Sequence, residues 1–253
     1  MLLNIDAKQI EWLAAVYWSQ DPVGMEELHT EYDIHADNQK RLKLPTRLIA
    51  KTLLFRTIYG GTGYSFATDP EFSNYGGEGW WDEKIATFLT KYQGLRAWHE
   101  RLYQRVVLDN GRLDLPTGRS YTFSPVLRRG AGSRGEVNYP RTKILNYPVQ
   151  GLAADLMAIA RVSLYKRIKA LNFNGILFVN TVHDSVVLDI KNEIWYTISS
   201  ELVNVVEEVF RDIPSNFKRL FDLDFNLPIR AEISAGQDWG NMEIMNADRI
   251  DST

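Results

Sequence analysis

The sequence predicts an α+β protein in which β-strands near the two ends of the chain flank a mainly helical middle. An apolar run at residues 2–7 is typical of a short buried strand. Apolar residues then recur at helical spacing in three segments between residues 46 and 171. Runs typical of strands return in the last third of the chain, at residues 176–179, 182–190 and 228–233, and a last helix is expected at residues 192–211.

Composition limits the class of protein. The 253 residues, of which 45% are hydrophobic, suffice for one large domain or two small ones. No apolar run approaches the roughly 18 residues of a membrane span, and the N-terminus lacks the basic stretch of a secretory signal. The chain has no cysteine, so any metal must be held by oxygen or imidazole ligands. These features fit a cytoplasmic enzyme.

Charge is distributed unevenly along the chain. The net charge of −3 argues weakly against a nucleic-acid partner. Residues 40–56, however, hold six basic and no acidic side chains, and residues 91–141 hold ten basic and four acidic ones. Residues 184–253 reverse this with fourteen acidic and six basic side chains. A basic middle is compatible with a polyanionic ligand, although ordinary solvated faces are the more common cause of such asymmetry.

Residues 46–60 form the most informative segment. Pro45 precedes it and Gly60–Gly61 follows it, which predicts a helix between them. Two cations and then two aromatic residues recur at every fourth position and share one slowly turning face: Arg47, Lys51, Phe55 and Tyr59. The cations lie near the positive end of the helix dipole, which suits phosphates, and the rings lie where a sugar and base would follow. The alternative is a solvated basic helix with two rings in the core.

Asp6 is the first candidate metal ligand. It ends the strand at residues 2–7 and precedes a helix expected at residues 9–17. A carboxylate at this place is either a metal ligand or a helix N-cap, and the cap is the more frequent role of an isolated residue. Residues 18–45, which include His35, are polar and are expected to be irregular.

Turn residues mark the middle of the chain. Asn110–Gly111 is a strong hairpin signal, and Thr117–Gly118 adds a second turn. The segments predicted here are a loop at residues 60–79, one helix at 80–108, a small β element at 112–123 and a mobile loop at 124–140.

A helix at residues 141–171 carries Asn146 and Gln150 one turn apart, and this amide pair can bind base edges or sugars, or simply bridge. Asp184 follows in an apolar hairpin whose turn is expected at Asn180–Thr181. An unpaired buried carboxylate is costly, so either a cation or a basic residue should accompany it. Asp6 and Asp184 together could hold two Mg²⁺ ions, the arrangement used in nucleotidyl transfer.

Four ordered motifs make a specific resemblance. The chain resembles the polymerase region of family-A DNA polymerases, the group of bacterial DNA polymerase I and the T-odd phage replicases. The similarity covers essentially the whole chain. The matching motifs are Asp6-Ala7-Lys8-Gln9-Ile10-Glu11 (motif A), Arg47…Lys51…Phe55…Tyr59-Gly60 (motif B), Asn146…Gln150-Gly151 with the small residues that follow, and Val182-His183-Asp184 (motif C).

The resemblance implies a role for each matching residue. Asp6, Asp184 and the Ala7 carbonyl would bind two Mg²⁺ ions, with Mn²⁺ as a possible substitute. Lys51 would also donate a proton to the pyrophosphate, and Glu11 would be the steric gate against ribonucleotides. The expected dNTP-binding residues are Gln9, Glu11, His35, Arg47, Lys51, Phe55 and Tyr59, and the expected DNA-binding residues are Tyr59, Gly60, Arg141, Asn146, Gln150 and His183.

The implied fold is a right-hand palm, an antiparallel sheet with helices, joined to a mainly helical fingers subdomain. The implied divisions are palm at residues 1–24 and 141–253 and fingers at residues 25–140, with motif C at 182–185. Ser185 departs from the family, which usually has Glu there, and Thr142 stands where an Arg is usual. Phe55, at a position that is Tyr in some members, implies discrimination against dideoxynucleotides.

Thumb and exonuclease segments are absent from this sequence. We therefore expect a split DNA polymerase whose C-terminal subunit is this chain, with primer–template DNA, dNTPs and a second polypeptide as partners. The strand at residues 2–7 would then need neighbours from that polypeptide. A catalytically inactive relic that binds nucleic acid or the replisome is the alternative, and a single-subunit RNA polymerase is a further one. The expected location is the cytoplasm of a bacterium or of a phage-infected host.

Overall fold

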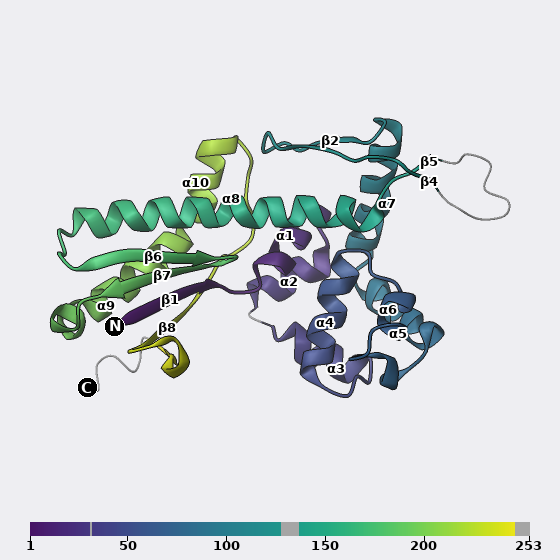
Figure 1. The fold of residues 1–253 in the computed structure, drawn as a ribbon. Helices are drawn as coiled ribbons and strands as arrows, with labels where there is room; N and C mark the ends of the chain where they lie inside the picture. Colours follow the sequence, from purple (N-terminus) through teal and green to yellow (C-terminus); the bar gives the residue numbers. More distant parts are fainter. Residues whose placement is uncertain (31, 128–136, 246–253) are drawn as a thin grey trace. The chain divides into compact units, whose positions relative to one another are not determined.

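A computed structural model describes residues 1–30, 32–127 and 137–245. The chain forms two compact units (Figure 1): Met1–Ile10 with Leu152–Thr253, here the sheet unit, and Glu11–Gly151, here the helical unit. The predicted boundaries between palm and fingers lie after residues 24 and 140 and differ from the boundaries of these two units. The assignment of residues to palm and fingers therefore stays a prediction. Among the described residues, no helix is both long and apolar enough to cross a membrane.

The sheet unit is built on five antiparallel strands in the order β6-β7-β1-β8-β9. The strand predicted at residues 2–7 is confirmed as β1 and lies in the middle of the sheet. Both of its neighbours come from this chain, so the expectation that β1 needs strands from a second polypeptide is wrong. The strands are β1 (Leu2–Ala7), β6 (Ile176–Val182), β7 (Ser185–Ile190), β8 (Ala231–Gly236) and β9 (Glu243–Ile244).

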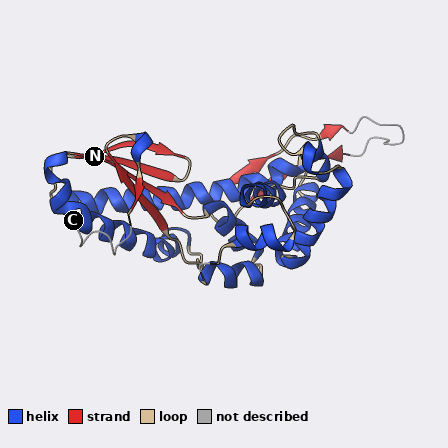
Figure 2. Ribbon diagram, turned by 90° about the horizontal axis from the view of Figure 1, so that it is seen from below, coloured by secondary structure: helices blue, strands red, loops and turns tan. Residues whose placement is uncertain are grey.

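Two helices follow the β6–β7 hairpin in the sheet unit. Figure 2 shows helices (blue) beside the strands (red) of this unit. The helix α9 (Asn192–Arg211) matches the prediction and buries its apolar stripe, including Ile198, Leu202 and Val206. The helix α10 (Ile213–Phe221), which the sequence analysis did not predict, buries Phe217. Alternation along β1, where Leu3 and Ile5 are fully buried, supplies the sheet side of this core.

The helical unit contains seven α-helices of its own among the residues described, and α8 begins in it. The helices are α1 (Ile10–Ser19), α2 (Pro22–His29), α3 (Ile34–Arg41), α4 (Arg47–Ile58), α5 (Gly63–Ala67), α6 (Glu78–Lys91), α7 (Gln93–Leu108) and α8 (Arg141–Ala170), with a short 3₁₀ helix, η1, at Ser73–Tyr75. Two small antiparallel pairs join β2 (Arg112–Asp114) to β3 (Ser120–Thr122) and β4 (Val126–Leu127) to β5 (Val137–Asn138).

Three predictions for this unit need correction. Residues 18–45 are not irregular, because Asp21 and Asp33 cap α2 and α3. Residues 60–79 contain α5 and η1 rather than only a loop. The helix predicted at residues 80–108 is two helices, because Tyr92 leaves the helical conformation with φ −104° and ψ 71°.

The prediction that Asn110–Gly111 forms a hairpin turn is wrong. Both residues have positive φ, 51° and 88°, as an Asn-Gly turn requires. They end α7 instead of joining two strands, since the Gly111 amide donates to the Val106 carbonyl at 2.8 Å. The small β element predicted at residues 112–123 is confirmed by β2 and β3. The mobile loop predicted at 124–140 falls largely on residues 128–136, outside the described part of the chain.

A fully buried carboxylate, Asp21, joins two helix N-termini. Its Oδ1 accepts hydrogen bonds from the amides of Val23 (3.1 Å) and Gly24 (3.0 Å) at the start of α2. Its Oδ2 accepts from the amides of Gly94 (2.7 Å) and Leu95 (3.2 Å) at the start of α7. The four donors are amides that have no partner within their own helices, so one side chain satisfies two helix ends and compensates its own burial.

We expect Asp21→Ala to lower the free energy of unfolding by about 3 kcal/mol, because it leaves buried amides unpaired at two helices. Asp21→Asn should cost less, since its Oδ1 can still cap α2. Urea unfolding followed by tryptophan fluorescence measures both. Asp109→Ala, at an exposed position after α7, is the control and should change stability by less than about 0.5 kcal/mol. Equal stability of Asp21→Ala and wild type would contradict this account.

Candidate functional site

Asp6 and Asp184 lie at the end of the sheet where β1 stops and β6 turns into β7, here called the edge of the sheet. Asp6 ends β1, and its partner across the ladder to β7 is Ser185, the residue next to Asp184. The Ala7 amide donates to the Asp184 carbonyl at 3.0 Å, which ties the end of β1 to the β6–β7 turn. Both carboxylate residues are half-buried. The strand register therefore brings together two residues that are far apart in the sequence.

The β6–β7 turn differs from the prediction. β6 continues to Val182, so the turn lies at His183–Asp184 and not at Asn180–Thr181. His183 takes φ 51° and is exposed. Asp184 consequently stands in the turn itself and is half-buried. The expected hairpin is confirmed, but the expected position of its turn is wrong. The Ser185 hydroxyl donates to the Val182 carbonyl at 3.0 Å and closes the turn.

The carboxylates of Asp6 and Asp184 fit a magnesium site that has few protein ligands. Mg²⁺ is bound in many enzymes by one or two carboxylates, and water and substrate oxygens complete its shell. Within the described residues, no group of three or more His, Asp or Glu side chains is placed to hold a metal. Glu232 on β8 lies opposite Asp6 in the ladder, and the sequence analysis did not identify it.

The cation–aromatic helix forms as predicted. α4 spans Arg47–Ile58, and the Thr46 hydroxyl accepts from the Ile49 amide at 3.2 Å as N-cap. Lys51 is exposed, and its Nζ lies 5.8 Å from the centroid of the half-buried Phe55 ring. The next ring on this face, Tyr59, is also half-buried. Neither ring is therefore in the core, which argues against the alternative of a solvated basic helix with two core rings.

His35 and Arg47 are connected through Asp33. Asp33 is the N-cap of α3, and its Oδ1 accepts from the amides of His35 and Ala36, both at 3.1 Å. The same carboxylate accepts from Nε of Arg47 at 3.2 Å and from Nη2 at 3.1 Å. Sequence reasoning missed Asp33, although an Asp directly before a helix is a recognised N-cap signal.

The His35 ring is uncharged near neutral pH. Burial is the main cause that lowers its pKa from 6.5 to about 4, and the nearby charges of Arg47 and Lys51 act in the same direction against the opposing Asp33. The side chain is 6% exposed, and its Nδ1 has no hydrogen-bond partner among the described residues. His35 can therefore act on an anion through a hydrogen bond rather than through charge.

Three predicted site residues from distant segments meet in the helical unit. The Tyr59 hydroxyl donates to Oε1 of Glu11 at 2.6 Å. Nε2 of Gln150 donates to the same Oε1 at 2.7 Å and to the Tyr59 oxygen at 2.6 Å. The side chains close a triangle that holds the Glu11 carboxylate in one position.

The remaining predicted residues are less closely grouped. Gln9 is exposed and has φ 53° between β1 and α1, and Gly60 has φ 74° directly after α4. Asn146 is half-buried on α8. Arg141 forms an ion pair with Glu100, with 2.5 Å between Nη2 and Oε1. Its charge is therefore partly balanced within the protein.

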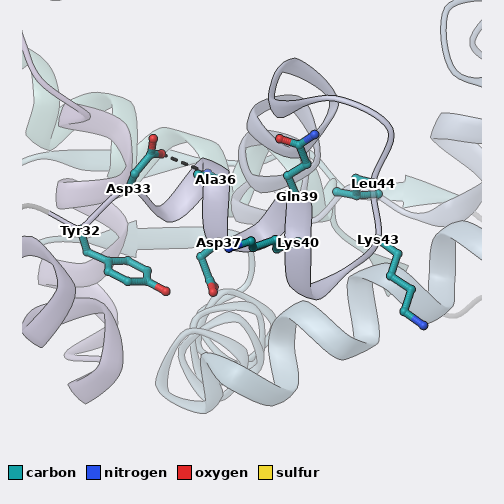
Figure 3. Close-up of a pocket in the computed structure, with 8 residues that line it drawn as sticks. All are labelled: Tyr32, Asp33, Ala36, Asp37, Gln39, Lys40, Lys43 and Leu44. Carbon is teal, nitrogen blue, oxygen red and sulfur yellow. Dashed lines mark hydrogen bonds between the residues drawn. The ribbon is translucent and has the colours of Figure 1, made fainter.

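A pocket of about 660 Å³ lies beside α3 (Figure 3). Asp33 stands on its wall, so the pocket borders the Asp33–Arg47 pair. Both charge types line it, together with a tyrosine ring: Tyr32, Asp33, Ala36, Asp37, Gln39, Lys40, Lys43 and Leu44. No residue predicted to bind a ligand is among them.

Comparison with known proteins gives consistent matches. The family model "DNA polymerase family A" matches residues 1–241. DNA polymerase I of Lactococcus lactis is 24% identical and that of Thermus filiformis is 27% identical, each over 94% of this chain. The chain spans about a quarter of these relatives, 26% and 27% of their lengths.

A solved structure shares the fold. The polymerase domain of Pol1 from M. smegmatis, in complex with DNA primer-template and dNTP, aligns with a TM-score of 0.70 and 18% identity. The alignment covers 94% of this chain and 40% of that one. The predicted α+β fold is confirmed.

We expect the free energy of unfolding to decrease as the pH is lowered from neutral. The folded pKa of His35 lies below the unfolded one, so its full contribution is present above pH 6.5 and is lost as the pH falls towards 4. At pH 5 wild type should have lost about 1–2 kcal/mol more than His35→Gln. Urea unfolding at pH 7 and pH 5 measures this. His29→Gln, at an exposed histidine, is the matched control and should follow wild type; a His35→Gln variant that also follows wild type would contradict the assignment.

Proposed function

This chain belongs to DNA polymerase family A, and on that premise we propose that it performs template-directed DNA synthesis, joining a dNTP to a primer 3′-hydroxyl. The single observation that carries the proposal is the meeting of Asp6 and Asp184 at one edge of the sheet, since each was predicted independently from its own segment. The formation of α4 with its cations at one end and its rings at the other supports the same conclusion.

Asp6, Asp184 and the carbonyl of Ala7 would hold two Mg²⁺ ions, or Mn²⁺ in their place. Bound there, the ions would lower the pKa of the primer hydroxyl and stabilise the leaving pyrophosphate. The protein's part is to place two carboxylates on adjacent backbone segments, which the hydrogen bond from Ala7 to Asp184 fixes. Ser185 in place of the usual Glu leaves the ligand set small, as suits ions that also bind substrate oxygens.

The dNTP would bind along α4. Arg47 and Lys51 would pair with the triphosphate, and neutral His35 would add a hydrogen bond. Lys51 would give its proton to the departing pyrophosphate, and Phe55 would pack on the sugar, with Gln9 as a further contact. Glu11, held by Tyr59 and Gln150, would crowd a ribose 2′-hydroxyl.

Primer–template DNA would be the second substrate. Tyr59 and Gly60 would stand at the templating position, and Arg141, Asn146, Gln150 and His183 would contact the duplex. Exposure of Gln150 and His183 is compatible with this role. Phosphate contacts would make the affinity fall with increasing salt.

A second polypeptide that supplies thumb and exonuclease is the finer proposal. Such a partner would add phosphate contacts to the duplex. It would not be needed to complete the sheet around β1, which has both neighbours already.

Primer extension by the purified chain at low salt, with Mg²⁺ and four dNTPs, tests the proposal. We expect Asp184→Ala to lower the extension rate by about 10³-fold, because it removes a metal ligand. Asp189→Ala, an exposed carboxylate on the same hairpin, is the matched control and should extend as wild type does. Extension that survives Asp184→Ala would overturn the assignment. Binding of DNA and dNTP without any extension would fit either the inactive relic or a subunit that needs its second polypeptide.

Competition between dNTPs and rNTPs separates a DNA polymerase from an RNA polymerase. We expect wild type to prefer dNTPs and Glu11→Ala to raise rNTP incorporation by at least about tenfold, because the gate is removed. Glu11→Gln, which keeps the size of the side chain, should retain most of the selectivity. A wild-type preference for rNTPs would favour a single-subunit RNA polymerase instead.

A further inference from the structure

We propose that Asp33 is a positioning residue that orients Arg47 and His35 together for a triphosphate. The inference rests on the proposed function, because the triphosphate is the substrate proposed there. It concerns how the site is preorganised before that substrate arrives. Asp33 itself would not touch the ligand, since two anions repel each other at close range.

The Asp33 carboxylate has two tasks at once. It caps α3 by accepting from the amides of His35 and Ala36, the second of which is drawn as a dashed line in Figure 3. It also accepts two hydrogen bonds from Arg47. The start of the helix that carries His35 and the side chain of Arg47 are thus fixed to one group.

The Asp33–Arg47 pair leaves one edge of the guanidinium available, the end edge formed by Nη1 and Nη2. Asp33 binds the side edge, which is formed by Nε and Nη2. A guanidinium has five N–H groups, so three remain: two on Nη1 and one on Nη2. In the described residues Arg47 donates to no other acceptor, and its side chain is 56% exposed. The end edge can therefore bind phosphate oxygens while the side edge stays on Asp33.

The state of His35 agrees with this arrangement. Its ring is buried, and Nδ1 lacks a partner in the part of the chain that the structure describes. Asp33 positions the backbone of this residue through the capping bond at 3.1 Å. A buried polar atom without a partner, next to a cation with an unused edge, is a combination that an anionic ligand would satisfy.

Asp33 remains ionised at neutral pH. Partial burial acts to raise its pKa, but the hydrogen bonds from Arg47, Ala36 and His35 outweigh that effect and hold the pKa below its ordinary range. A carboxylate in this state could instead compete with the phosphates for Arg47. The two possibilities predict opposite effects of removing its charge.

Asp33→Asn separates the two tasks of the residue. The Asn Oδ1 can still cap α3, whereas its amide nitrogen cannot accept from Nε of Arg47. Titrating the full chain with dATP, and separately with inorganic tripolyphosphate, measures the dissociation constants by calorimetry. We expect both constants to rise about three- to tenfold in Asp33→Asn, with helix content and urea midpoint unchanged. Asp109→Asn, which removes an exposed carboxylate paired with Arg105, is the matched control and should bind as wild type does.

A double-mutant cycle with Arg47→Ala tests whether Asp33 acts through Arg47. On the Arg47→Ala background, Asp33→Asn should cause little further loss, an outcome that a purely structural role would not give. Unchanged or tighter binding by Asp33→Asn in the wild-type background would overturn the inference, and tighter binding would identify Asp33 as a competitor. Failure of the wild-type chain to bind either probe would instead overturn the proposed function, and this inference with it.

Discussion

The helical unit depends on the burial of one carboxylate. The side chain of Asp21 is buried, and four backbone amides donate to it, two from α2 and two from α7. The geometry restricts its surroundings: a Cβ at Gly94 would lie 2.7 Å from the Asp21 Cα. Part of the aromatic core lies beside this junction: the ring of Tyr92, directly before α7, packs against that of Trp12, with 4.9 Å between the ring centroids. The unit is therefore organised around a polar contact that only a complete set of donors makes tolerable.

The candidate residues of the sheet unit and those of the helical unit differ in their electrostatics. At the end of the sheet, backbone pairing holds the half-buried residues Asp6 and Asp184 near each other, and both are proposed to bind a cation. Around α4, the cations are moderated instead: Arg47 is paired with Asp33, and the buried His35 ring is neutral. At the proposed triphosphate site, such pairing would allow a polyanion both to bind and to be released.

Local signals explain most of what the sequence predicted. β1, α4 and α9 have strong periodicity and clear boundary residues, so their own residues specify them. The break at Tyr92 and the β6–β7 turn were missed because tertiary contacts decide them. His183 adopts positive φ without being Gly, and it does so because pairing of Asp6 with Ser185 sets the register. The residue types of the site were predictable, but the Asp33–Arg47 hydrogen bonds, which need two helices in contact, were not.

The triangle of Glu11, Tyr59 and Gln150 has a consequence for how such a protein changes over generations. Each side chain supplies a hydrogen bond that another requires, and the three come from α1, the end of α4 and α8. An alteration at one position changes the environment of the other two, so their effects will be epistatic. If Glu11 selects the sugar as proposed, substitutions at Tyr59 and Gln150 would also change the selectivity, through their hydrogen bonds to Glu11.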